Sequence, residues 1–208
     1  MNAFKKFAFL SLLLSFPLLL FSQEGGYGKG MCFDLGIGWM PVTNYPGDTQ
    51  TGINALASMP GVTEVQINLN LDIGFFLWEN IPSQLQLNRA PTRNYLIFGI
   101  DGYATRLQDD IGSLQLNNYI FGVGLESVTG GWLARVIIGP ASCVVQASAD
   151  GITESGSSSP GVGVATKLGY DFNTRKGFGL CLALNADLSW IESEPYSALG
   201  LSVSVTYF

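Results

Sequence analysis

The sequence predicts an all-β protein, a closed antiparallel up-and-down barrel of eight strands that crosses a membrane. Apolar and polar residues alternate with period two in eight segments. The polar positions of these segments hold mainly small residues, and the chain has 26 glycines. Only 12% of its residues are charged, against about 25% in soluble domains. The length of 208 residues fits one domain.

Residues 1–22 are predicted to be a secretory signal peptide. Lys5 and Lys6 give a positive start, and an apolar run follows over 7–21. This run is shorter than the ~20 residues that a membrane-spanning helix needs. We therefore expect an exported chain whose mature part, residues 23–208, is a single barrel domain.

The strand pattern is clearest in residues 64–77. Val65 begins a row of apolar residues at every second position, and Glu64 begins a row of Gln, Asn, Asp and Gly. A helix would mix the two rows around its circumference, whereas a strand separates them. The same alternation predicts seven more strands, over 32–39, 95–101, 118–126, 131–148, 161–172, 178–190 and 199–207.

The links between these strands favour a barrel with loops at one end and tight turns at the other. They are predicted at 41–62, 79–93, 107–116, 128–130, 149–160, 173–176 and 191–197. After the first hairpin, long and short links alternate, except that 79–93 is long. Its residues 84–88 suit an extra strand, and a ten-stranded barrel with a partner strand inside 41–62 is the alternative.

The polar face decides which side of the sheet points outward. A soluble barrel covers its exterior with long charged side chains, but this face carries mainly Gly, Asn, Ser and Ala, which suit the interior of a narrow barrel. We therefore expect the apolar rows to face lipid, with closure removing every unpaired edge. Aromatic residues near the strand ends are expected to form interfacial girdles: Trp39, Trp78, Tyr95, Tyr119, Trp132, Tyr170, Phe172, Phe178, Trp190 and Tyr207. A soluble secreted β-barrel or sandwich that binds an apolar ligand is the alternative.

The signal, the eight alternating segments and the C-terminal residues 203–208 together resemble the small outer-membrane barrels of the OmpA-barrel and OmpX type. The resemblance is architectural and rests on no diagnostic motif. It implies an outer-membrane location, contact with outer-membrane lipid, a monomer, and recognition of the last strand by the barrel-assembly machinery. Tyr207, rather than Phe208, continues the apolar row of that strand.

Composition excludes several functions. The chain has no histidine, the commonest general base and metal ligand, and we expect no enzyme activity, cofactor or metal site. The chain has 10 Lys and Arg against 16 Asp and Glu, and it has no basic cluster that would bind nucleic acid.

The three cysteines, Cys32, Cys143 and Cys181, lie in separate strands on the expected interior face. The sequence leaves two options open, one disulfide or three free thiols.

Eight charged residues fall on the expected interior face, where a filled lumen is predicted. A buried charge needs a partner, so each base should contact acids, and the pair Glu126–Arg135 is expected across the short link at 128–130. The predicted lumen network is Asp34, Asp72, Asp101, Glu126, Arg135, Lys167, Asp171 and Asp187.

Charge also separates the two ends of the barrel. Four links carry seven acids and no base: Asp48, Asp109, Asp110, Asp150, Glu154, Glu192 and Glu194. With both termini in the periplasm, this acidic end faces outside and attracts divalent cations or basic ligands. The sequence thus predicts a non-enzymatic barrel for envelope structure or surface interaction, with a narrow pore for small molecules as the alternative.

Overall fold

The computed structural model describes residues 30–80, 91–172 and 177–207. The predicted signal peptide and the candidate extra strand at 84–88 lie outside these residues. Within them the chain forms nine strands and one helix, with these bounds: β1 Met31–Asn44, α2 Gly47–Ala57, β2 Thr63–Asn80, β3 Thr92–Gln108, β4 Gly112–Thr129, β5 Trp132–Ala149, β6 Ile152–Ser157, β7 Gly161–Asp171, β8 Phe178–Ile191 and β9 Glu194–Tyr207.

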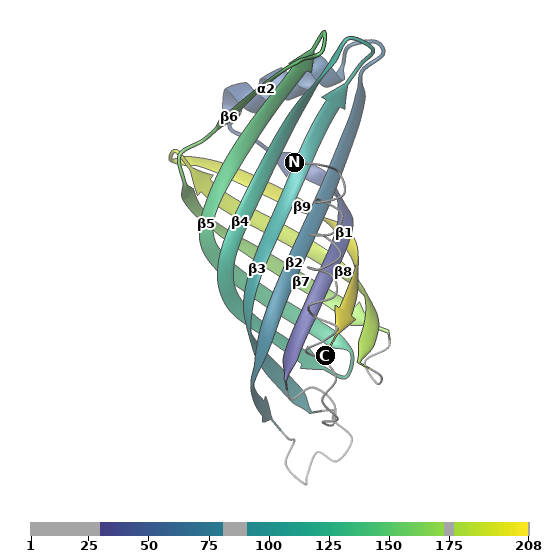
Figure 1. Cartoon of the computed structure of the whole chain (residues 1–208), viewed down its shortest axis with the longest axis vertical. Helices are drawn as coiled ribbons and strands as arrows, with labels where there is room; N and C mark the ends of the chain where they lie inside the picture. Colours follow the sequence, from purple (N-terminus) through teal and green to yellow (C-terminus); the bar gives the residue numbers. More distant parts are fainter. Residues whose placement is uncertain (1–29, 81–90, 173–176, 208) are drawn as a thin grey trace, which may run out of the picture.

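Eight of the strands close into one antiparallel barrel (Figure 1). Each barrel strand pairs with its neighbours along the chain, and β1 pairs with β9 to close the circle, as in Phe33 opposite Tyr207. The short strand β6 pairs with the outer part of β5, and β7 pairs with the rest of β5. The eight-stranded prediction is confirmed. The ten-stranded alternative required a strand inside 41–62, where the structure has the end of β1 and the helix α2.

The apolar rows of the strands face outward. Leu69 is 53% exposed while its neighbour Asn68 is fully buried, and on β8 Leu182 is 49% exposed while Asn185 is fully buried. Exposed Leu, Val, Ile, Phe and Trp occur on all eight barrel strands. Such an exterior is stable in hydrocarbon and not in water, so the chain is a transmembrane barrel.

Aromatic side chains form a girdle at the end of the barrel where β1 begins and β9 ends, here called the terminal end. The ring centroids of Trp132 and Tyr170 lie 5.3 Å apart, and those of Phe178 and Tyr207 lie 4.7 Å apart. Tyr95 is an exception, because it is 1% exposed and points into the barrel. Its predicted place in the girdle is therefore wrong.

The opposite end, here called the acidic end, differs from the predicted set of loops. The links expected at 107–116 and 191–197 shrink to 109–111 and 192–193, because the strands continue through the rest. Strands β2 to β5 are 17 or 18 residues long, whereas about 9–11 residues cross a membrane. These four strands consequently project beyond the membrane, and α2 lies beside them at the top of Figure 1.

The helix α2 was not predicted from the sequence. Pro46 precedes it and Asp48 lies in its first turn, where a negative charge favours the helix dipole. Ile53 is buried, and Leu56 and Ala57, three and four residues further on, pack against the same cluster. This spacing is the helical signal that the alternation of the neighbouring strands obscured.

Candidate functional site

The eight predicted lumen residues all lie inside the barrel. None is more than 4% exposed: Asp34, Asp72, Asp101, Glu126, Arg135, Lys167, Asp171 and Asp187. The alternation of each strand places them there, because every one occupies an inward position. The bases come from β5 and β7, and Asp34, Asp72 and Asp101 come from β1, β2 and β3.

Arg135 connects β5 to two strands beyond its neighbour β4. Its guanidinium forms ion pairs with Asp72 and Asp101. Asp101 also accepts a hydrogen bond from Nδ2 of Asn68, at 3.0 Å. Glu126 lies directly opposite Arg135 in the sheet, but among the described residues no ion pair joins these two side chains. The expected Glu126–Arg135 pair is therefore wrong.

Lys167 crosses the lumen to Asp34. Its Nζ lies 2.8 Å and 2.7 Å from the two carboxylate oxygens, and 2.8 Å from Oγ of Ser204. Ser204 Oγ also donates to Asp34, at 3.1 Å. Asn70 donates to Asp34 as well, from β2. This site thus ties β7, β9, β1 and β2 together through one buried ion pair.

The lumen acids outnumber its bases, six to two. Asp171 accepts a hydrogen bond from Thr206. Within the described residues, neither oxygen of Asp187 has a hydrogen-bond partner, and Oε2 of Glu126 has none either. Burying a charge without a partner costs free energy, so these two carboxyls stabilise the lumen network less than the paired acids do.

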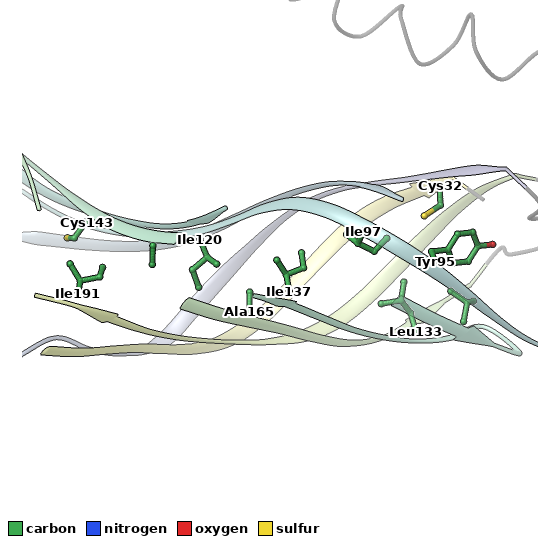
Figure 2. Close-up of a cluster of buried hydrophobic side chains, with 11 residues drawn as sticks. Cys32, Tyr95, Ile97, Ile120, Leu133, Ile137, Cys143, Ala165 and Ile191 are labelled. Atoms are coloured by element: carbon green, nitrogen blue, oxygen red, sulfur yellow. The ribbon is translucent and has the colours of Figure 1, made fainter. Parts of the chain in front are cut away.

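Apolar side chains fill much of the remaining interior. Figure 2 shows Ile120, Ile137 and Ile97 following one another along the barrel, from Cys143 and Ile191 at one end to Tyr95 and Leu133 at the other. The sequence predicted an interior of mainly small and polar residues, and most of this apolar layer was not expected. Its signal was present in the inward positions of β3 and β5, which hold Tyr95, Ile97, Leu133 and Ile137.

A second apolar cluster closes the lumen at the acidic end. Ile53 of α2 packs with Tyr45, Tyr103, Leu107 and Leu116, which are all less than 6% exposed. The Tyr45 hydroxyl donates to Oγ1 of Thr105, at 2.7 Å. Burial raises the pKa of Tyr45, so this phenol stays neutral at physiological pH. The helix therefore forms a lid of apolar contacts over the charged lumen.

The three cysteines are buried and unbonded to one another. Cys32 lies near the start of β1, Cys143 lies in the outer half of β5, and Cys181 lies in β8. Of the two options that the sequence left open, the structure has three free thiols.

Two of the seven predicted acids at the acidic end accept hydrogen bonds from backbone N–H groups. Asp109 Oδ1 accepts hydrogen bonds from the backbone N–H of Ile111, at 2.8 Å, and of Gly112, at 2.7 Å. These bonds hold the pKa of Asp109 below its usual value. Glu192 accepts a bond from the N–H of Ser159, at 2.9 Å. The remaining five are Asp48, Asp110, Asp150, Glu154 and Glu194.

Two adjoining cavities lie at the tips of the projecting strands. One, of about 280 Å³, has apolar walls from Leu56, Val62, Leu107 and Leu114. The other, of about 260 Å³, is lined by Asp110, Asp150 and other polar residues. It also contains Arg106, a base that the sequence reading did not count because it precedes the predicted link. In the part of the chain that the structure describes, no three Cys, Asp or Glu residues are grouped to hold a metal ion.

Solved structures of small outer-membrane barrels are similar to this chain. Ail, the attachment invasion locus protein of Yersinia pestis, in complex with the heparin analogue sucrose octasulfate, has 12% identity and a TM-score of 0.48, over 86% of this chain and all of that one. The N-terminal β-barrel domain of Pseudomonas aeruginosa OprF has 15% identity and a TM-score of 0.42, over 86% of this chain and 99% of that one. OprG from Pseudomonas aeruginosa has 9% identity and a TM-score of 0.36, over 88% and 97%.

No family model and no curated protein matches the chain. Among the described residues, no helix has the length and apolar character to cross a membrane. The closed barrel, its lipid-compatible exterior and its aromatic girdle make the chain an outer-membrane β-barrel protein.

Proposed function

We propose that this barrel is a non-conducting, non-enzymatic membrane anchor that presents an acidic surface outside the cell to basic ligands. One observation carries the proposal: the lumen is occupied by the side chains of Arg135 and Lys167 with their acids, and α2 covers its acidic end. An eight-stranded barrel has an interior just wide enough for its own side chains. The projecting strands are then the part of the molecule that is free to meet a partner.

The negative charge of the acidic end supports a positively charged ligand. Asp48, Asp110, Asp150, Glu154 and Glu194 lie on α2, on β6 and at the turns of this end, with Arg106 as the base among them. A surface of one charge sign attracts ligands of the opposite sign and speeds their association. Basic peptides or polyamines are therefore the ligand class that we expect.

The closed lumen can be tested in planar bilayers. The refolded full chain should give no stepwise conductance, and regular single-channel steps would overturn the anchor hypothesis. Folding would be checked first by heat-modifiable migration in unboiled detergent gels, which a closed barrel should show.

The surface role can be tested by titrating trilysine into the barrel in phosphatidylcholine nanodiscs. Binding should weaken as salt rises, because exposed charges are screened within a Debye length of about 8–10 Å. The variant Asp110→Asn with Asp150→Asn should bind more weakly than the parent. Lack of any binding above that of empty nanodiscs would refute the surface role.

A further inference from the structure

The two cavities at the acidic end share much of their lining. Gln108, Asp109 and Ile111 contribute to both, and so do Gly112, Ser113 and Ala149. One cavity is apolar and the other polar, so the tip of the β3–β4 hairpin separates two kinds of environment over a short distance. The two cavities therefore adjoin at this tip.

The apolar cavity lies between α2 and the inner face of the projecting strands. Leu56 and Val62 come from α2 and the segment after it, and Leu107 and Leu114 come from β3 and β4. Ile111 forms its lip and is 72% exposed. An apolar side chain this exposed at a turn is unfavourable in water, and a bound apolar group would cover it.

The charges around the cavities determine the charge of the polar group that a ligand at this site would carry. Asp109 lines both cavities, and Asp110 and Asp150 line the polar one together with Arg106. Three acids and one base give the residues around the cavities a net negative charge. This charge repels fatty acids and other anionic amphiphiles and attracts an ammonium or guanidinium group.

We propose that these adjoining cavities form one binding site for a small cationic amphiphile, with its apolar group between α2 and the β3–β4 hairpin and its cationic group near Asp110 and Asp150. The inference deepens the proposed function, on which it rests for the outward orientation of the acidic end. It adds an apolar requirement that a purely electrostatic surface would lack.

The experiment compares four probes on the full chain in phosphatidylcholine nanodiscs, with empty nanodiscs subtracted, by isothermal titration calorimetry. Hexylammonium should bind at least about tenfold more tightly than methylammonium, because burial of its chain adds hydrophobic free energy. It should also bind more tightly than hexanoate, which has the wrong charge. Trilysine reports on the acidic surface alone.

A matched pair of variants locates the site. Ala149→Phe places a large side chain in the shared lining and should weaken hexylammonium binding at least about tenfold, while trilysine binds as before. Ala134→Phe makes the same change on the exposed exterior of β5 and should leave both probes unaffected. Ile111→Ser, at the exposed lip of the apolar cavity, is a second variant that tests for the same loss of hexylammonium binding if Ala149→Phe does not fold.

The outcomes separate the two proposals. Trilysine binding without a preference for hexylammonium over methylammonium would overturn the amphiphile site and leave the proposed function in place. Hexylammonium binding that Ala149→Phe abolishes, without trilysine binding, would support the site and refute the wider acidic surface. Equal hexylammonium binding by the parent and Ala149→Phe would overturn the site.

Discussion

Arg135 and Glu126 lie directly opposite each other in the β4–β5 ladder, and yet the guanidinium of Arg135 ion pairs with Asp72 and Asp101 instead. Arg135 is also opposite Lys167 on its other side. Like charges opposite each other are unfavourable, and the same holds for Asp34 opposite Asp72. Pairing across the lumen relieves both repulsions, since bases of β5 and β7 meet acids of β1, β2 and β3.

Replacing Arg135 should be among the most destabilising single changes in the lumen. Arg135→Ala leaves Asp72 and Asp101 buried without their cation, and the loss of one partner of a buried pair costs about 3–5 kcal/mol. Urea unfolding in lipid vesicles would measure it. Arg93→Ala is the control, because the Arg93–Glu79 pair is about one-fifth exposed, whereas Arg135 is fully buried, and Arg93→Ala should cost less than Arg135→Ala. An unchanged unfolding midpoint for Arg135→Ala would contradict the cross-lumen network.

The lumen carboxyls should fall into two classes when each is replaced by its amide. Asp101→Asn removes an ion-pair partner of Arg135 and should lower the free energy of unfolding by about 2 kcal/mol. Glu126→Gln replaces a buried carboxyl that has no ion pair among the described residues and an oxygen without a hydrogen-bond partner. Its unfolding free energy should stay the same or rise. If Glu126→Gln destabilised the barrel as much as Asp101→Asn, the assignment of partners would be wrong.

The sequence was sufficient to predict the barrel, because the period-two alternation of apolar and polar residues is a local property of each strand. The eight charges that it assigned to the lumen are all buried inside the barrel, since each strand's inward row follows from its outward row. Partner choice depends on how the sheet curves, and this is why Glu126 was expected to pair with Arg135. The helix α2 and the inward Ile120 and Ile137 were missed for a related reason, because the inward rows were expected to hold mainly small and polar residues.

The turn at Asp109 should order the acidic end in a pH-dependent manner. Hydrogen bonds from Gly112 and Ile111 lower the pKa of Asp109 below its ordinary value of 3.8. A carboxyl with a lowered folded-state pKa stabilises the turn above its unfolded pKa, and this contribution is lost as the pH falls through the folded value. At pH 6, hydrogen exchange of the Ile111 and Gly112 amides should therefore be slower in the parent than in Asp109→Ala.

Below the folded-state pKa of Asp109, the parent and the Asp109→Ala variant should exchange at rates that converge. Asp110→Ala is the matched control, because among the described residues no hydrogen bond to its carboxylate holds the turn, and it should exchange like the parent at both pH values. A difference between the parent and Asp109→Ala that persisted unchanged in acid would show that the carboxylate is not the cause.

The β8–β9 turn contains strain that a single substitution should release. Glu192 and Ser193 both have positive φ, at 54° and 69°, and this left-handed conformation costs a residue with a Cβ about 1–2 kcal/mol. The corresponding β4–β5 turn uses Gly130 and Gly131, as two-residue hairpins prefer. Ser193→Gly should therefore raise the free energy of unfolding by up to about 1 kcal/mol, offset in part by the greater freedom of glycine in the unfolded chain. Gly131→Ala, at a φ of 95°, is the converse control and should lower it. Urea titrations of the three proteins would show the order, and a less stable Ser193→Gly would refute the strain.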